Sequence, residues 1–347
     1  MGFLERLQEN RINGRFTLIR KLAEGGGGDV YYGADCEQVP TILTPADDQL
    51  GRDHELGQDV AVKLEHRRSH LLRDEGIWLG TFEDTPGFPT ILRSGYHDEV
   101  GFLILNLLGP SLEDLFEYCE CQFSLKTTIM LADQLLARLE TVHSKNILQR
   151  DVKPGNFLMG TGEDGNTVYI TDFATATGYR PGSPLGYGED LTQSDQGLIG
   201  TIWFASIRGH TGRSQAPADD LEALGYMLIY FVRGSLPWLG LDACSVTGKD
   251  QDQVVMEKKI ALSVDDLCSE LPTAFAEYMT TVKRLKGCER PPYDELRELF
   301  KSIAREECIQ YDNVFDWTER MYRQQLALED SVLIQGYSDP VSKGQRR

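Results

Sequence analysis

The chain has 347 residues, with 54 acidic and 35 basic side chains, so its formal net charge is −19. Hydrophobic residues make up 41% and charged residues 26%, a globular composition that excludes wholesale disorder, collagen and coiled coil for the whole chain. The acidic balance argues against nucleic acid or a membrane surface as a partner, because proteins that bind either usually present a basic face to phosphates.

No segment resembles a membrane span or a secretory signal. The longest apolar run, 224–232, is about half the length that crosses a bilayer, and the N-terminal residues lack an apolar core. The seven cysteines are scattered and odd in number, which favours reduced thiols inside the cell. We therefore expect a cytoplasmic protein, with the nucleus as a second compartment, and a monomer.

The first third of the chain is predicted to be rich in strands. Apolar periodicity predicts four strands and one helix, and a run of turn-forming and charged residues predicts a surface loop insertion at 36–58. The strands are expected at 16–22, 30–32, 60–64 and 102–105, and the helix at 71–82.

The remainder of the chain is predicted to be mainly helical. Ser111 and Ser124 are candidate N-caps of two helices, and Asp114 lies in the first turn of the earlier one. A strand-rich part followed by a helical part predicts two unlike lobes with a ligand cleft between them. Helices are expected from Ser111, at 124–143 and at 221–232, a hairpin at 157–159 and 168–170, a long loop at 175–200 and a frayed polar end after about residue 325.

Four glycines, 25–28, separate the first two predicted strands. Glycines let backbone amides approach a phosphate, but a tight hairpin fits the pattern equally well. Lys63 lies on the next apolar strand, and Glu75 follows on the predicted helix. A buried lysine needs a charged partner, whereas a surface lysine beside a solvated glutamate does not, and these residues alone leave both interpretations open.

The most specific chemical pattern spans residues 149–174. Asp151, Lys153 and Asn156 precede the predicted hairpin, and Asp172 follows it. Two carboxylates and an amide oxygen suit Mg²⁺, and a nearby lysine can neutralise the charge of a transferred phosphate. A polar turn after a helix is the alternative, but it explains this combination of residues less well.

These three sets have the order and spacing of the protein kinase signature. The chain resembles a eukaryotic protein kinase and, within that superfamily, the casein kinase 1 family, over residues 15–318. The closer resemblance rests on 107–116, 123–127, 143–146, 156–160, 219–226 and 234–238, and on Ala205-Ser206-Ile207, where most other kinases have Ala-Pro-Glu.

The resemblance implies a bilobal α+β fold, with the nucleotide cleft between a small strand-rich N-lobe and a larger helical C-lobe. The expected parts are an N-terminal extension 1–14, a kinase domain 15–318 and a polar tail 319–347. Within the domain, the N-lobe is expected at 15–105 with the 36–58 insertion, the hinge at 106–109 and the C-lobe at 110–318.

The resemblance also implies ATP and Mg²⁺ as cofactors and proteins as substrates. Lys63, paired with Glu75, is implied to hold the α- and β-phosphates, and Lys153 to support the γ-phosphate. Asp151 is implied to orient or deprotonate the substrate hydroxyl. The other ATP contacts are expected at Ala23, Gly25, Gly28, Val30, Ala61, Leu105, Asn106, Leu108 and Leu158.

Two further side chains, Asn156 and Asp172, are implied to hold the metal ion. Leu105 is implied to be the gatekeeper of the adenine site, with Asn106 and Leu108 in the hinge. Asp220 is implied to brace the catalytic loop from a buried helix.

Several positions depart from the family pattern. Ala23 and Gly27 replace a glycine and an aromatic residue of the glycine loop, which predicts a more mobile lid over the phosphates. Gln149 replaces the histidine before the Arg-Asp pair, Gly155 replaces an aspartate and Ala174 replaces the glycine after Asp-Phe.

The largest departure concerns substrate choice. Trp203 stands where relatives have an arginine that attracts acidic or already phosphorylated substrates, and the basic run after Pro-Trp-x-Gly-Leu has become 242–250, which is no longer basic. An anion site without its cations loses most of its attraction. We therefore expect no preference for phosphorylated substrates.

Two functions fit this sequence. The first is an ATP- and Mg²⁺-dependent kinase of Ser and Thr residues, because Lys153 follows Asp151 by two positions, as in Ser/Thr kinases. The alternative is a pseudokinase that acts as a nucleotide-binding scaffold or allosteric partner. The departures favour the alternative, and the complete set of charged residues favours the enzyme.

Overall fold

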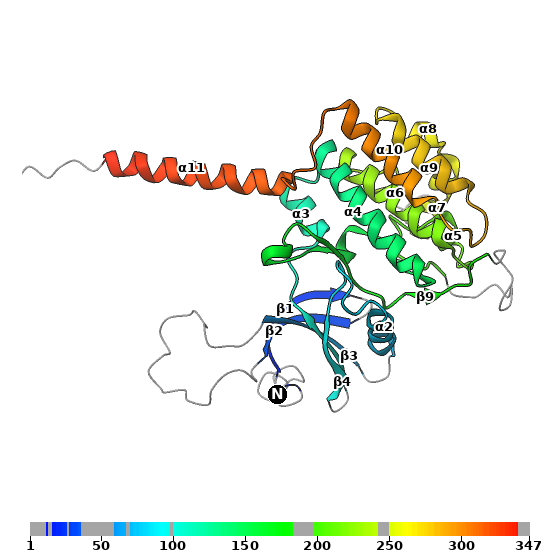
Figure 1. The fold of residues 1–347 in the computed structure, drawn as a ribbon, viewed down its shortest axis with the longest axis horizontal. Helices are drawn as coiled ribbons and strands as arrows, with labels where there is room; N and C mark the ends of the chain where they lie inside the picture. The colour runs from blue at the N-terminus through cyan, green and yellow to red at the C-terminus, as the bar shows by residue number, and fades with distance from the viewer. Residues whose placement is uncertain are drawn as a thin grey trace, which may run out of the picture.

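A computed structural model describes residues 12, 16–25, 28–35, 59–66, 70–97, 100–182, 197–241 and 250–338. The expected insertion 36–58, all of the N-terminal extension except Ile12, and the former basic run at 242–249 lie outside the described residues. Strands gather in one part of the molecule and helices in the other (Figure 1). The α+β architecture with two unlike lobes is confirmed.

The N-lobe is a five-stranded antiparallel sheet in the order β1-β2-β3-β5-β4, with helix α2 packed against β3, β4 and β5. Residues alternate across β3, so that Val60 and Val62 are fully buried in a core with Ile104 while Lys63 points to the opposite face. The elements are β1 (Phe16–Gly25), β2 (Gly28–Asp35), β3 (Asp59–His66), α2 (Leu71–Gly80), β4 (Ile91–His97) and β5 (Val100–Asn106).

One strand of this sheet, β4, was not predicted from the sequence. Its residues are exposed or half-buried along their whole length, because β4 is an edge strand whose only partner is β5. Such a strand lacks the alternation of apolar and polar residues by which strands are recognised. The four strands that were predicted are all present.

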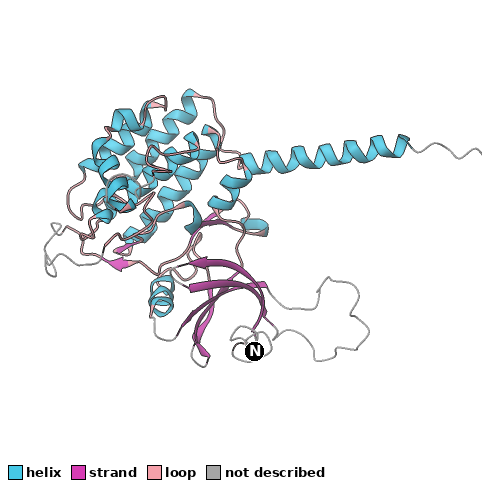
Figure 2. Cartoon of the chain, turned by 180° about the vertical axis from the view of Figure 1, so that it is seen from behind, coloured by secondary structure: helices cyan, strands magenta, loops and turns pink. Residues whose placement is uncertain are grey.

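The C-lobe is built around two buried helices, α4 and α6. Helix α10 packs on α4, and α9 packs on α6 (Figure 1). Seen from behind, most of the helices again lie in one part of the molecule and the sheet in the other (Figure 2). Both expected N-caps are confirmed: Ser111 and Asp114 form a capping box, and the Ser124 hydroxyl accepts a hydrogen bond from the Thr127 N–H. The helices are α3 (Leu112–Tyr118), α4 (Leu125–Ser144), α5 (Ile207–His210), α6 (Pro217–Arg233), α7 (Gln251–Ala261), α8 (Val264–Leu267), α9 (Thr273–Arg284) and α10 (Tyr293–Glu306).

Two small strand pairs lie where the lobes meet. The predicted hairpin is confirmed, with Phe157 paired to Ile170 and Met159 paired to Val168. The expected long loop at 175–200 contains the short strand β9, and its residues 183–196 lie outside the described part. The strands are β6 (Ile147–Leu148), β7 (Phe157–Met159), β8 (Val168–Ile170) and β9 (Thr177–Gly178).

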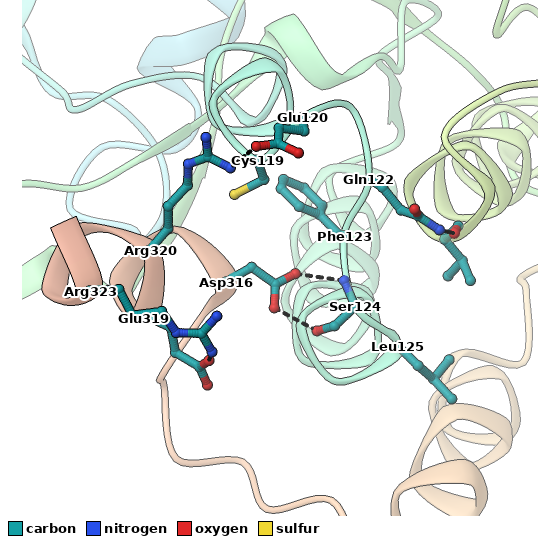
Figure 3. Close-up of a pocket in the computed structure, with 11 residues that line it drawn as sticks. Cys119, Glu120, Gln122, Phe123, Ser124, Leu125, Asp316, Glu319, Arg320 and Arg323 are labelled. Atoms are coloured by element: carbon teal, nitrogen blue, oxygen red, sulfur yellow. Dashed lines mark hydrogen bonds and ion pairs between the residues drawn. The ribbon is translucent and has the colours of Figure 1, made fainter. Parts of the chain in front are cut away.

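The end of the described chain is a long helix, α11 (Asp316–Ser338), that projects from the C-lobe (Figure 1). The expectation of frayed chain after about residue 325 is therefore wrong up to Ser338. The start of α11 is fixed by Asp316, whose carboxylate accepts bonds from Ser124 N at 2.6 Å and Ser124 Oγ at 2.7 Å, beside a pocket of about 580 Å³ (Figure 3). No described helix is both long and apolar enough to cross a membrane.

Candidate active site

The first group of predicted residues meets between the sheet and α2. Lys63 Nζ lies 2.6 Å from Glu75 Oε1 and 3.7 Å from Asp172 Oδ1, although Glu75 and Asp172 are far apart in the sequence. The Glu75 side chain is fully buried, so the lysine is the buried, paired kind rather than a surface lysine. Burial alone lowers the pKa of Lys63, but the two carboxylates outweigh burial and raise this pKa above its usual value.

Local structure explains how this pair is held. Lys63 lies on β3 opposite Leu103 of the buried strand β5, which fixes its direction. Helix α2, which carries Glu75, is tied to the same strand by Glu65: its carboxylate accepts bonds from the N–H groups of Leu71 at 3.1 Å and Leu72 at 2.9 Å. A carboxylate at a helix N-terminus satisfies free amides and stabilises the helix dipole. This role of Glu65 was not predicted from the sequence.

The second group surrounds Asp151. Its Oδ2 lies 2.7 Å from Lys153 Nζ and accepts a bond from Asn156 Nδ2 at 3.2 Å. Its Oδ1 accepts a bond from the Thr201 hydroxyl at 2.6 Å. Two other predicted residues, Lys153 and Asn156, thus contact the Asp151 carboxylate, and Thr201 contacts it from a segment fifty residues later. Thr201 follows Gly200 and lies two residues before Trp203, but no sequence pattern marks it as a contact of Asp151.

Helix α6 holds the backbone that precedes Asp151. The Asp220 carboxylate accepts the N–H groups of Gln149 and Arg150, both at 2.8 Å, and also contacts His143 Nε2 at 2.9 Å. Arg150 has a φ of 64°, a strained value for a non-glycine residue that surrounding contacts must maintain. The bracing position expected for Asp220 is therefore observed.

Gln149 bridges the two chemical segments. Its Nε2 donates to the carbonyls of Thr171 at 3.0 Å and Asp172 at 2.8 Å, and the residue is fully buried. Asp172 has a φ of 59°, so both carbonyls flank another strained residue. The departure at Gln149 keeps a side-chain donor at this junction rather than removing one.

The residue after Asp172 locks the same segment to the core. Phe173 is fully buried, and its ring centroid lies 5.5 Å from that of Phe82 and 6.3 Å from that of Phe88. Its N–H donates to Glu75 Oε1 at 3.4 Å, a long bond that joins the segment to α2. Asp172 therefore points towards Lys63 on a backbone that is anchored on both sides.

The residues expected to bind the nucleotide lie on the strands above this group. Val30 is paired with Lys63 across β2 and β3, and Ala61 with Leu105 across β3 and β5. The backbone of Ala23, Gly25 and Gly28 forms the ends of β1 and β2, while residues 26 and 27 lie outside the described part. The adenine-site residues nearer the hinge are half-buried, namely Asn106, Leu108 and Leu158.

The side-chain oxygens of Asn156 and Asp172 fit a magnesium ion bound with nucleotide phosphates. Asp172 keeps a carboxylate that is 31% exposed, and Asn156 uses its amide nitrogen for Asp151, which leaves the amide oxygen as its metal ligand. Mg²⁺ commonly takes one or two protein carboxylates and completes its shell with phosphate oxygens and water. Among the described residues, no group of three or more His, Cys, Asp and Glu side chains is placed to hold a metal.

The segment after Thr201 carries the departure at Trp203. Trp203 and Ile202 are partly buried against the main core, and the Trp203 carbonyl accepts a bond from Trp238 Nε1 at 2.9 Å. An indole thus takes the position at which the resemblance implies a guanidinium. At Gly155, by contrast, an added Cβ meets nothing within 4 Å, so the position has room for a side chain and no close packing requires glycine there.

The chain was compared with known protein families. The protein kinase domain matches residues 89–308, which is more than half of the chain and includes Asp151, Lys153, Asn156 and Asp172. Lys63 and Glu75 precede the matched residues, and the structure brings them to Asp172. The fold, the buried ion pair and this match agree, and the chain belongs to the protein kinase family.

Proposed function

We propose that this protein is an active ATP- and Mg²⁺-dependent kinase of Ser and Thr residues, similar to casein kinase 1 but with an altered substrate site. The observation that carries the proposal is that the predicted charged residues assemble into two clusters. The Lys63–Glu75 pair at 2.6 Å extends to Asp172, and Asp151 collects Lys153 and Asn156. A scaffold requires only the fold, whereas phosphoryl transfer also requires these charged side chains in position.

Each side chain has a distinct task in the proposed reaction. Bound ATP would supply the γ-phosphoryl group and leave as ADP, and a bound Mg²⁺ would supply neutralisation of the charge on the phosphate oxygens. Lys63 holds the phosphates from the N-lobe, while Lys153 neutralises charge beside Asp151. The Asp151 carboxylate orients the incoming hydroxyl and accepts its proton, and Asn156 and Asp172 hold the metal. Positioning and charge neutralisation supply most of the acceleration.

The departures from the family pattern do not remove this machinery. Gln149 keeps two hydrogen bonds to the Asp172 segment, and Gly155 lies beside open space. Ala174 donates its N–H to Asp172 Oδ1 at 3.4 Å, so its methyl group is compatible with the orientation of that carboxylate. These contacts support an enzyme over the scaffold. Within the described residues, no contact specifically favours the scaffold.

The proposed substrate rule follows from Trp203. The indole is neutral and packs against the core, so it offers no charge to a phosphorylated or acidic substrate. We therefore propose that the protein does not require a phosphate already on its substrate, unlike the family that it resembles.

The transfer of labelled phosphate from ATP to casein in the presence of Mg²⁺ tests the proposal. Wild-type protein is expected to label casein, and Asp172→Asn to abolish the signal. Asp164→Asn is the matched control, because Asp164 lies at the far end of the β7–β8 hairpin and contacts Tyr169. A folded wild-type protein that labels no better than Asp172→Asn contradicts an enzyme and favours the scaffold.

A further inference from the structure

A buried lysine lies directly under the segment that meets the catalytic loop. Lys259, on helix α7, is only 2% exposed. Its Nζ donates to the carbonyls of Ile202 at 3.0 Å and Ala205 at 2.7 Å, and it contacts His210 Nε2 at 3.0 Å. The three N–H donors of one ammonium thus meet three acceptors, two of them backbone atoms of the segment 201–205.

The surroundings of Lys259 are mainly apolar. The Nζ atom lies 5.1 Å from the ring centroid of Tyr226 and 5.2 Å from that of Trp238. Burial lowers the pKa of Lys259 to about 7, against the opposing charges of Glu222 and Asp252. A methionine fills a similar volume without the cost of burying a charge. The donors of Lys259, rather than its bulk, therefore distinguish it at this position.

His210 completes this arrangement. Its Nδ1 contacts Asp252 Oδ1, so a neutral imidazole with its proton on Nδ1 presents Nε2 as an acceptor to Lys259. Burial, followed by the charge of Lys259, lowers the pKa of His210, which favours this neutral form. Helices α5 and α7 are thereby joined by a polar chain that ends on the backbone of the segment 201–205.

The same segment is linked to the catalytic group at its other side. Thr201 bonds Asp151 Oδ1 at 2.6 Å, and Trp238 holds the carbonyl of Trp203 at 2.9 Å. Three carbonyls within five residues are therefore held by side chains from α7 and from the turn after α6. A shift of this backbone moves both Thr201 and the surface beside Asp151.

We propose that Lys259 is a positioning residue for the protein substrate. Its Nζ donates to the carbonyls of Ile202 and Ala205, which two N–H groups of either the charged or the neutral amine can do, and so holds the backbone of the segment 201–205 in the conformation that places a substrate chain beside Asp151. Lys259 contacts neither the nucleotide residues nor Asp151, and it acts only through this segment. The proposal rests on the kinase activity proposed above, and it concerns peptide binding rather than ATP binding.

The variant Lys259→Met tests this role, with Lys258→Met as the matched control because Lys258 is exposed on the same helix. Lys259→Met is expected to raise the KM for a Ser/Thr peptide about tenfold, the scale of losing hydrogen bonds from a charged group. The KM for ATP is expected to stay within about twofold, since no nucleotide contact changes. Equal KM values for the peptide in Lys259→Met and wild type overturn the proposal.

A second variant and a second measurement keep the test decisive. Trp238→Phe removes the donor to Trp203 and keeps an aromatic ring, and it is expected to raise the peptide KM about threefold. Hydrogen exchange of the amides at 201–206 needs no activity and is expected to quicken in Lys259→Met but not in Lys258→Met. If wild type transfers no phosphate, the kinase proposal fails by itself, while unchanged exchange at 201–206 refutes the role of Lys259.

Discussion

The nucleotide side and the substrate side of this molecule differ in how they use positive charge. On the nucleotide side, Lys63 faces the cleft and is balanced by Glu75 and Asp172. On the substrate side, Lys259 is buried beneath the loop and holds backbone carbonyls, while the loop itself presents Trp203. The first lysine is placed to meet a ligand, and the second supports the loop from within. Under the proposed function, the lysine implied for catalysis is retained, whereas position 203, where the resemblance implies an arginine for the substrate, carries an indole.

The largest effect is expected on the nucleotide side, from Lys63→Met. The variant removes the cation between two carboxylates and the contact to the phosphates, so kcat/KM is expected to fall about a hundredfold or more. Steady-state kinetics with ATP as the varied substrate measure this loss. Lys126→Met is the control, because it removes a lysine paired with Asp312 at 2.8 Å in the C-lobe. Similar losses in both variants contradict the special role of Lys63.

The replacement of the family histidine by Gln149 is expected to be tolerated because Gln149 still donates hydrogen bonds to the Asp172 segment. Gln149→Ala removes both hydrogen bonds to the Asp172 segment, so kcat is expected to fall about tenfold and the free energy of unfolding by about 1–3 kcal/mol. Transfer assays and urea denaturation measure the two effects. Gln149→His retains a ring donor and is expected to keep more activity than the alanine variant. An alanine variant with full activity and stability rejects the bridging role.

On the substrate side, Trp203→Arg is expected to restore a preference that wild type lacks. A guanidinium at position 203, two residues after the Asp151 contact Thr201, adds a positive charge to this segment and is expected to favour a phosphorylated peptide by about 1 kcal/mol, which is about fivefold in kcat/KM. Matched phosphorylated and unphosphorylated peptides measure the ratio, and Trp203→Gln controls for the loss of the indole without a new charge. A strong preference for the phosphorylated peptide in wild type contradicts our interpretation of Trp203.

The last expected effect is on stability rather than on activity, and it concerns the pH dependence of the free energy of unfolding. The pKa of Lys259 is about 7 in the folded protein, below its ordinary value of 10.5. Between these values the unfolded chain binds the extra proton, so this lysine makes the folded state more stable as pH rises. Thermal unfolding between pH 7 and 10 is expected to show a smaller rise for Lys259→Met than for Lys258→Met. Parallel curves for both variants show that Lys259 has no lowered pKa.

The sequence predicted the elements with strong apolar periodicity and the residues with distinctive chemistry. Strand β3, helix α4 and the β7–β8 hairpin lie close to their expected positions, because burial on one face produces a readable period. Asp151, Asn156 and Asp172 were singled out because a metal and phosphate site explains their spacing better than a polar turn does, and their roles in such a site stay a prediction. The match to the protein kinase domain supports the predicted fold as well.

The contacts that the sequence did not reveal are those made through the backbone or over long separations. Glu65 caps α2, Thr201 bonds Asp151, and Lys259 holds the carbonyls at 202 and 205. Each is a common residue type whose partner is a main-chain atom or a distant side chain, so no local pattern marks it. Helix α11 was missed because its exposed residues lack the single apolar stripe of a packed helix.

The most direct test of the central claim is phosphoamino acid analysis after wild-type protein, labelled ATP and Mg²⁺ act on a mixed library of Ser, Thr and Tyr peptides. The proposed chemistry predicts label on serine and threonine, no label on tyrosine, and no signal from Asp172→Asn. Label on tyrosine contradicts the proposed specificity. A folded wild-type protein that labels no peptide above the Asp172→Asn level contradicts the claim that this site transfers phosphate.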